Sequence, residues 1–255
     1  MAGMTIQEYE RITPVTTVDV GGSRINYVTP NSRTVWRAQT LFKKEPSTIE
    51  WLDSMEAGDV LFDVGANVGM YSIYAAVKQG VRVHAFEPEA DNFSILCRNA
   101  LVNKVSDWVT CWPLALSNAR RYDRLYIREP GAGNSCNSFG AEVDFNLAPS
   151  RFPVSQGCVS ATLDDMVEAR AIDRPNHIKI DVDGFEHLVL EGARKLLGDP
   201  GLRSSCIEIN PSIEAHRIVV RDLLEAGFAI DAEQVARATR AEGPFKGVAE
   251  HVFRR

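Results

Sequence analysis

The sequence predicts one α/β domain, with a mostly parallel sheet of seven strands and helices on both faces. From residue 58 onward, short apolar runs rich in β-branched residues alternate with segments of helical period, as in a sheet with crossover helices. The chain has 255 residues, 45% of them hydrophobic and 24% charged, which suffices for one such domain and an elaboration. Two small domains are the less favoured alternative.

Residues 1–50 are predicted to form an N-terminal leader on the substrate side, and residues 51–255 the main domain. Strand-like runs at 15–20 and 24–28 flank the turn residues Gly21 and Gly22. Pro46 and Ser47 suit the start of a helix, which is predicted to reach about Met55.

The main domain is predicted from its alternating pattern. The expected strands are 60–64, 82–86, 108–112, 177–182 and 205–209, with late strands near 228–231 and 247–253. The expected helices are 70–78, 90–102, 185–197 and 213–226. Val60, Leu61 and Phe62 are apolar at successive positions, as buried parallel strands require.

One segment, 129–157, interrupts this alternation. It contains Gly131, Gly133, Gly140 and several prolines among Asn and Ser residues. A loop of this length inside a compact domain is functional or disordered. We expect a lid over a substrate pocket, and a plain mobile insertion is the alternative.

Composition excludes several classes of protein. The net charge of −6 argues against electrostatic binding of a nucleic acid backbone. The five cysteines never form a C-x-x-C pair, which argues against a zinc site or a disulfide scaffold. No signal-peptide core and no run of roughly 18–20 apolar residues is visible, so a cytoplasmic protein is expected.

The run from Phe62 to Tyr71 reads as a strand, a glycine-containing turn and a helix start. Gly65 permits a tight turn and close ligand approach, and Gly69 permits close packing of helix on strand. Asn67 and Val68 fill positions where the dinucleotide fingerprint G-x-G-x-x-G has glycine. Asp63 would repel phosphates and suits a ligand with cationic ammonium and sulfonium groups.

An acidic residue follows the next strand. Glu87 lies in Phe-Glu-Pro-Glu, 18 residues after Gly69, where a carboxylate can accept both ribose hydroxyls. Taken alone, Asp63 could be a turn cap and Glu87 a solvated strand end. Their joint spacing within one βαβ unit favours a nucleoside-binding site.

These motifs make the chain resemble the FkbM-type methyltransferase family over most of residues 45–210. The resemblance rests on DVGANVG (63–69), FEPE (86–89), LDDM (163–166) and IKIDVDGFE (178–186), with KEPSTIEW (44–51) in the leader. It implies the class I methyltransferase (Rossmann-like) fold, with S-adenosylmethionine as donor and S-adenosylhomocysteine as product. It also implies an acceptor hydroxyl on a sugar, glycolipid or natural product.

The resemblance also implies site residues. Asp63, Gly65, Asn67 and Gly69 would line the methionine portion, Glu87 would hold the ribose, and Ser117 would lie near adenine. Asp181 is expected to contribute to both the cofactor and the catalytic site. Asp183 stands where the family more often has Glu, and we expect little consequence for cofactor binding.

Charged side chains follow the fourth and fifth strands of the main domain. Lys179, Asp181 and Asp183 share one face by the period of two, and such groups are costly to bury unpaired. Asp181 is the first candidate for the general base or for orienting the acceptor. Lys179 could pair with Asp181, orient it, or act as base if burial lowers its pKa. Glu208 and Asn210 could bind acceptor hydroxyls. The predicted catalytic residues are therefore Asp181, Lys179 and Glu208.

The alternatives are a structural ion-pair network of Lys179, Asp181 and Glu208, or a Mg²⁺ site of Asp181, Asp183, Glu208 and Asn210. The metal site is not favoured, because carboxylates gather at strand ends for many reasons. Trp36 in the leader is expected to be a packing residue, with stacking on a sugar as the alternative. A homodimer is compatible with the leader and the late strands.

Two other functions compete with this prediction. A nicotinamide-dependent oxidoreductase would require Gly at position 67 or 68, and the sequence has neither. A non-catalytic S-adenosylmethionine-binding module would be expected to lack the strand-end carboxylates, which are present. Neither alternative is favoured.

Overall fold

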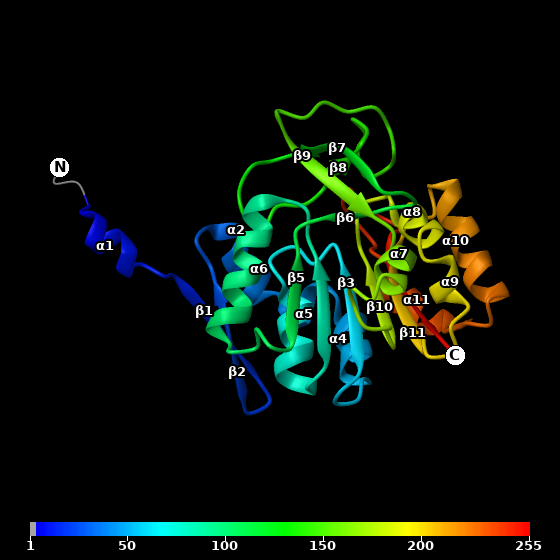
Figure 1. Cartoon of the computed structure of the whole chain (residues 1–255), viewed down its shortest axis with the longest axis horizontal. Coiled ribbons are helices and arrows are strands. Elements are labelled where there is room, and N and C mark those ends of the chain that lie inside the picture. Colours follow the sequence, from blue (N-terminus) through cyan, green and yellow to red (C-terminus); the bar gives the residue numbers. More distant parts are fainter. Residues whose placement is uncertain (1–3) are drawn as a thin grey trace.

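The computed structural model describes residues 4–255, which contain a central seven-stranded sheet (Figure 1). Its order is β12-β13-β11-β10-β3-β4-β5. The strands are β3 (Val60–Val64), β4 (Arg82–Phe86), β5 (Val109–Trp112), β10 (His177–Ile180), β11 (Ser204–Ile209), β12 (Ala229–Ile230) and β13 (Ala249–Arg254). Pairing is parallel from β5 through β11, and β13 runs antiparallel to both neighbours. The predicted mostly parallel α/β fold is confirmed.

The chain order reverses between β3 and β10. From the central β3, the chain first adds β4 and β5 on one side and later adds β10 and β11 on the other. In open α/β sheets, ligands bind at the carboxyl ends of the strands at such a switch point. The topology therefore predicts a site beyond Val64 and Ile180.

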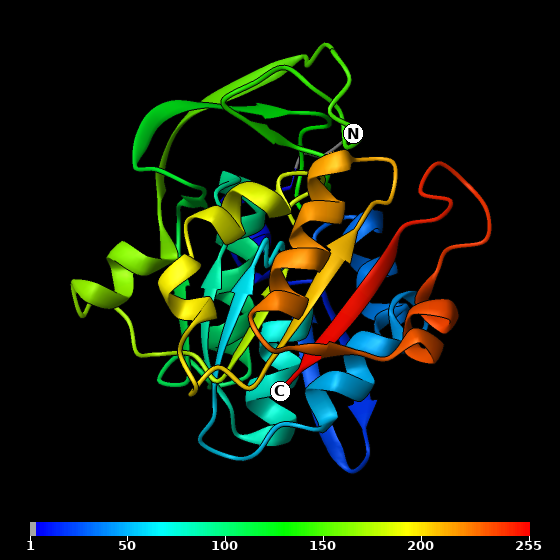
Figure 2. The same cartoon turned by 90° about the vertical axis from the view of Figure 1, so that its right-hand side faces the viewer.

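Helices cover both faces of the sheet (Figure 2). One face carries α4 (Pro46–Asp53), α5 (Met70–Tyr74) with its π-helical continuation η1 (Ala75–Gln79), α6 (Ala90–Val102) and, beside α4, α11 (Ala232–Ala238). The other carries α7 (Leu163–Glu168), α8 (Glu186–Glu191), α9 (Arg194–Leu197) and α10 (Glu214–Glu225). Each face of the sheet packs against its helices in a separate hydrophobic core. Successive residues of β3 point to opposite faces, so Leu61 packs in the first core and Phe62 in the second.

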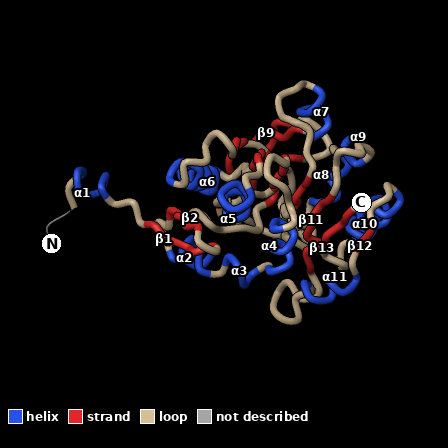
Figure 3. Tube along the Cα trace, turned by 90° about the horizontal axis from the view of Figure 1, so that it is seen from below, coloured by secondary structure: helices blue, strands red, loops and turns tan. Residues whose placement is uncertain are grey.

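Most of the predicted leader packs against the main domain. The hairpin β1 (Val15–Val20) and β2 (Ser23–Val28), α2 (Ser32–Gln39) and α3 (Leu41–Lys44) lie on the α5 and α6 side, whereas α1 (Ile6–Arg11) projects away from the domain (Figure 3). Val28 donates its N–H to Asn99 Oδ1 at 2.7 Å, and the Tyr27 hydroxyl donates to the Met70 carbonyl at 2.9 Å. The two predicted strand-like runs are confirmed, and they pair as a hairpin. The predicted boundary after residue 50 falls inside α4, and residues 1–3 of the leader lie outside the described residues.

A second sheet lies beyond the carboxyl ends of the parallel strands (Figure 1). Its order is β6-β9-β7-β8, with β6 (Ala115–Leu116), β7 (Arg121–Ile127), β8 (Ser138–Phe139) and β9 (Val154–Ala161). The sequence did not indicate β7, because its first residues are charged and exposed. The insertion 129–157 is therefore partly strand, since it contains β8 and the start of β9.

Two predicted elements differ from the structure in a way that bears on the site. The expected helix 185–197 is split into α8 and α9, with Gly192 as the C-cap of α8. Gly in a helix interior is unfavourable, which accounts for the break. The expected strand 177–182 ends at Ile180; the Asp181 N–H still donates to the Val64 carbonyl of β3, and the Val182 N–H donates to Glu186 instead. Within residues 4–255, no helix is both long and apolar enough to cross a membrane.

Candidate cofactor and acceptor site

A cavity of about 300 Å³ lies at the switch point. The ends of β3, β4, β10 and β11 form its floor, and α2, the insertion and the second sheet enclose it. Most of the predicted site residues line this cavity: Gly65, Asn67, Glu87, Ser117, Lys179, Asp181 and Glu208. Asp63, Gly69 and Asn210 do not line it.

Glu87 bridges the two turns that follow β3 and β4. Its Oε2 accepts the Asn67 N–H and its Oε1 accepts the Glu89 N–H, both at 2.8 Å. Burial raises the pKa of Glu87 to about 7, although the two N–H groups oppose the shift. The carboxylate is thus fixed at the cavity wall, with further lone pairs for a ligand's hydroxyl groups.

Gly65 joins the two sides of the switch point. Its φ is +81°, and a Cβ there would lie 1.9 Å from the Asp181 carbonyl oxygen. The predicted need for glycine therefore holds, but the close neighbour is the backbone after β10. Asn67 also has a left-handed backbone, with φ of +52°, and its side chain accepts the Val68 N–H.

Asp63 and Gly69 have structural positions beneath the cavity. Asp63 is 1% exposed, and its Oδ2 accepts the Ser72 hydroxyl at 2.5 Å. A Cβ at Gly69 would lie 2.4 Å from Leu96 Cδ1. This glycine therefore permits close packing against helix α6, whereas the prediction was packing against a strand. Neither residue lines the cavity, where the methionine portion was predicted to contact them.

Lys179 and Asp181 form a buried ion pair, with Nζ 3.1 Å from Oδ2. Burial lowers the pKa of Lys179, but the charges of Asp181, Glu45 and Asp63 outweigh it and raise the pKa above the ordinary value. Burial likewise raises the pKa of Asp181, but Lys179 and Lys44 hold it well below its usual range. The paired charges therefore favour a protonated Lys179 and an ionised Asp181, which argues against either group as the proton acceptor.

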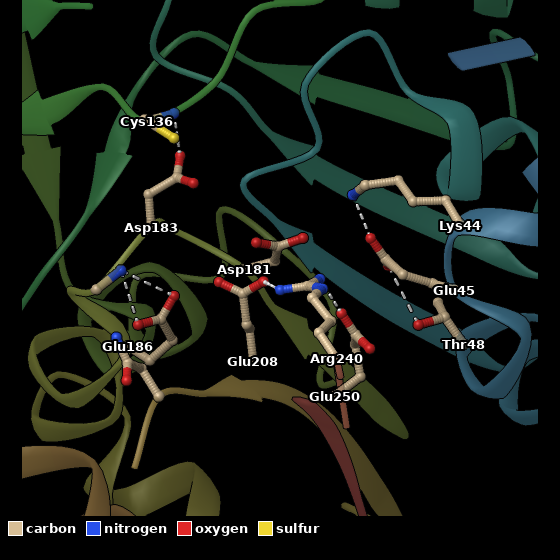
Figure 4. A network of polar contacts seen from close by, with 12 residues as sticks. Lys44, Glu45, Thr48, Cys136, Asp181, Asp183, Glu186, Glu208, Arg240 and Glu250 are labelled. Carbon is tan, nitrogen blue, oxygen red and sulfur yellow. Dashed lines mark hydrogen bonds and ion pairs between the residues drawn. The ribbon is translucent and has the colours of Figure 1, made fainter. Parts of the chain in front are cut away.

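Asp183 differs from Asp181 although only one residue separates them. Its φ is +55°, and its Oδ2 accepts the Cys136 N–H of the insertion at 2.7 Å (Figure 4). Burial and then the charge of Asp181 raise the pKa of Asp183 to about 7. The carboxyl group lines the cavity and is poised to exchange a proton near neutral pH. The sequence showed no sign of this difference, which depends on the turn and the insertion.

Glu208 is held by a cation that the sequence analysis missed. Arg240 donates to Glu208 Oε1 at 2.7 Å and to Glu250 Oε1 at 2.5 Å (Figure 4). The predicted role of Asn210 in acceptor binding is not supported, because its amide donates to Asn146 of the insertion. Arg240 follows α11, far from β11 in sequence, so no local pattern connects it with Glu208.

Three carboxylates converge at the cavity floor. Oxygen atoms of Asp181, Glu186 and Glu208 lie within 4.8 Å of one another. Lys179 and Arg240 neutralise two of them, and Glu186 accepts the Val182 and Gly184 N–H groups. This cluster fits an ion-pair and hydrogen-bond network, and its donors do not require a metal ion.

The insertion is attached directly to the cofactor side of the cavity. The Asn134 carbonyl accepts from Asn67 Nδ2 at 2.7 Å and from Asn92 Nδ2 at 3.1 Å. Gly133 donates its N–H to Asn92 Oδ1 at 2.7 Å. Asn134, Ser135, Asn137 and Phe139 of the insertion line the cavity, and a lid over the substrate pocket stays a prediction.

Comparisons with known proteins relate the chain to methyltransferases. The family model of the methyltransferase FkbM domain matches residues 63–230. A hexuronic acid methyltransferase of Haloferax volcanii is 25% identical over 219 residues, covering 86% of this chain and 84% of that protein. A 31-O-demethyl-FK506 methyltransferase of Streptomyces tacrolimicus is 30% identical over 199 residues, covering 71% and 76%.

Among solved structures, a precorrin-6y C5,15-methyltransferase from Geobacter metallireducens aligns with a TM-score of 0.48 and 13% identity, over 86% of this chain and 92% of that one. The family match spans the turn after β3, the Asp181 segment and β11, and it leaves out α2 and Arg240. It therefore includes the floor of the cavity and the insertion. The chain belongs to the FkbM family of methyltransferases.

Proposed function

We propose that this methyltransferase transfers the methyl group of S-adenosylmethionine to a hydroxyl group of a sugar, glycolipid or natural product. The names of the two relatives, a hexuronic acid methyltransferase and a 31-O-demethyl-FK506 methyltransferase, support such acceptors. One observation carries the proposal: the same cavity is lined by Glu87, placed to bind the ribose hydroxyls, and by Asp183, whose pKa is raised to about 7.

The donor set of the cavity fits this cofactor. Glu87 would hold the ribose hydroxyls, and Phe86 and Leu116 provide apolar walls near Ser117 for the adenine. Asp181 is an anion beside the site where the cationic end of the ligand would lie. Bound there, the cofactor supplies an electrophilic methyl group on a sulfonium sulfur.

Asp183 is the proposed proton acceptor. The acceptor hydroxyl would donate its hydrogen bond to the Asp183 carboxylate and lose its proton to it as the new O–CH₃ bond forms. Asp181, kept ionised by Lys179, would orient the reactants without taking the proton. Glu208 is kept in place by Arg240 and would contact the acceptor from the floor of the cavity.

Calorimetric titration tests the cofactor. We expect micromolar binding of S-adenosylmethionine and none of NAD; binding of NAD instead would favour the oxidoreductase alternative. Transfer of a labelled methyl group should then be followed on a panel that contains glucuronate oligosaccharides and 31-O-demethyl-FK506. Binding without transfer to any hydroxyl would favour a non-catalytic module.

An Asp183→Asn variant tests the base. With the acceptor that supports transfer, we expect turnover to fall by about 10²–10⁴-fold while cofactor affinity stays near wild type. Asp183→Glu should restore part of the turnover and shift its pH profile. Wild-type turnover in Asp183→Asn would contradict the assignment.

A further inference from the structure

Helix α2 presents two side chains to the cavity that the proposed chemistry does not use. Trp36 and Arg37 both line it, and the Trp36 side chain is 44% exposed. Arg37 donates to the Gly133 carbonyl of the insertion, three residues before Cys136, whose N–H donates to Asp183. Helix α2 therefore borders the part of the cavity that the insertion covers, where the acceptor is expected.

Arg37 differs from the other cations that line the cavity. Lys44 pairs with Glu45, Lys179 pairs with Asp181, and Arg240 pairs with two carboxylates. Among the residues whose side chains the structure describes, no carboxylate forms an ion pair with Arg37. Its Nε donates to the Gly133 carbonyl at 2.6 Å, which leaves the terminal nitrogen atoms of its guanidinium for a ligand.

Trp36 lies next to this cation at the rim of the cavity. An indole face is a flat, apolar surface on which the C–H face of a sugar ring can stack, with little side-chain entropy to lose. Trp108 is equally exposed, at 45%, but does not line the cavity. Exposure of Trp36 thus coincides with a pocket, whereas exposure of Trp108 does not.

The position of both side chains is fixed before any ligand binds. Asn31 caps α2 by accepting the Thr34 N–H, and its amide donates to the Ala132 carbonyl of the insertion at 2.9 Å. The Arg37–Gly133 hydrogen bond adds a second attachment. A preorganised surface of this kind binds with a smaller entropic cost.

We propose that Trp36 and Arg37 form an acceptor subsite for an acidic saccharide. The sugar ring stacks on Trp36, its carboxylate or phosphate pairs with the Arg37 guanidinium, and a ring hydroxyl faces Asp183. A planar guanidinium matches either anion with two parallel hydrogen bonds. This inference rests on the proposed function, because it assigns the acceptor of the same site.

Saturation-transfer NMR on the protein loaded with S-adenosylhomocysteine tests the subsite without turnover. The probes are D-glucuronate, D-glucose 6-phosphate and neutral D-glucose. We expect at least one acidic sugar to bind about tenfold more tightly than glucose, the size of one charge-assisted contact. The identity of that sugar distinguishes a carboxylate from a phosphate.

Variants separate the two contacts. Arg37→Gln should remove the preference for the acidic sugar and leave glucose binding unchanged, whereas a loosened insertion would weaken both sugars alike. Arg37→Lys should retain part of the preference. Trp36→Ala should abolish binding of all three sugars. Trp108→Ala and Arg33→Gln, with Arg33 exposed on the same helix and paired with Glu129, are matched controls and should behave as wild type.

The outcomes are distinguishable. Failure to bind S-adenosylhomocysteine would overturn the proposed function itself. Normal binding of S-adenosylhomocysteine, with no acidic sugar preferred over glucose or with the preference intact in Arg37→Gln, would overturn only the subsite. Retained binding of S-adenosylhomocysteine in each variant also shows that the variant is folded.

Discussion

The two sides of the cavity are built in different ways. The cofactor side comes mainly from one continuous βαβ unit, in which Asn67, Glu87 and Asn92 are separated by 25 residues at most, with Leu116 and Ser117 added after β5. The acceptor side comes from α2, the insertion 129–157, the turn after β10 and the loop with Arg240. Recognition of the donor is therefore encoded locally, whereas recognition of the acceptor depends on the assembled fold.

The largest expected effect is at the contact between the two sides. Gly65→Ala would place a Cβ 1.9 Å from the Asp181 carbonyl at a φ of +81°. We expect a loss of about 3–5 kcal/mol in the free energy of unfolding, because backbone on both strands must move. Gly58→Ala is the matched control: its φ is +89° but its Cβ would meet nothing within 4 Å. Gly58→Ala should lower the free energy of unfolding, measured in urea, by about 1 kcal/mol. Equal losses in the two variants would show that the two sides are not in tight contact.

The second effect separates the sides functionally. Glu87→Gln removes a charged acceptor that the ribose is proposed to use, so the Kd for S-adenosylhomocysteine should rise about 10–100-fold. Asp183→Asn should change this Kd less than about threefold, because Asp183 belongs to the acceptor side. Calorimetry on both variants measures the contrast. Equal weakening would mean that the cofactor extends over Asp183.

The third effect concerns pH. Asp183 has its pKa raised from 3.8 to about 7, so the folded chain keeps a proton there that the unfolded chain has lost. Stability contributed by this group is therefore present below pH 4 and is lost as the pH rises towards 7. The advantage of Asp183→Asn over wild type in free energy of unfolding should grow by on the order of 2 kcal/mol from pH 5 to pH 8. Urea denaturation at both pH values measures this difference, with the exposed Asp107→Asn as control. An unchanged difference would mean that the pKa of Asp183 is not raised in the folded protein.

The smallest effect concerns the attachment of the insertion. Asn92→Ala removes one hydrogen bond to the Asn134 carbonyl and one from the Gly133 N–H. We expect amide hydrogen exchange at residues 131–137 to accelerate roughly tenfold, because each such bond contributes about 1 kcal/mol. Exchange in β3 should not change. Unchanged exchange in the insertion would mean that its other contacts suffice.

The same contrast explains what the sequence could predict. Strand runs such as 60–64 and 82–86, and the spacing of Gly65 and Glu87, are local patterns, and they predicted the sheet and the cofactor turn. The different environments of Asp181 and Asp183 were invisible, because Lys44, Lys179 and Cys136 reach them from three separate segments.

Two further differences between the sequence analysis and the structure have physical causes. Asp63 looked like a ligand residue because it precedes the turn, but its alternation in β3 directs it into the core beside Ser72. Arg240 was overlooked because its partners, Glu208 and Glu250, lie on β11 and β13. Strand pairing places Glu208 opposite Glu250, and the loop that holds Arg240 bonds to Val248 just before β13.

A crystal structure with bound S-adenosylhomocysteine tests the central claim most directly. The account predicts both ribose hydroxyls on the Glu87 carboxylate, the sulfur atom directed towards Asp181 and Asp183, and Trp36 and Arg37 free of the ligand. A ligand whose ribose lies away from Glu87, or which occupies the surface of Trp36 and Arg37, would contradict the division into cofactor and acceptor sides.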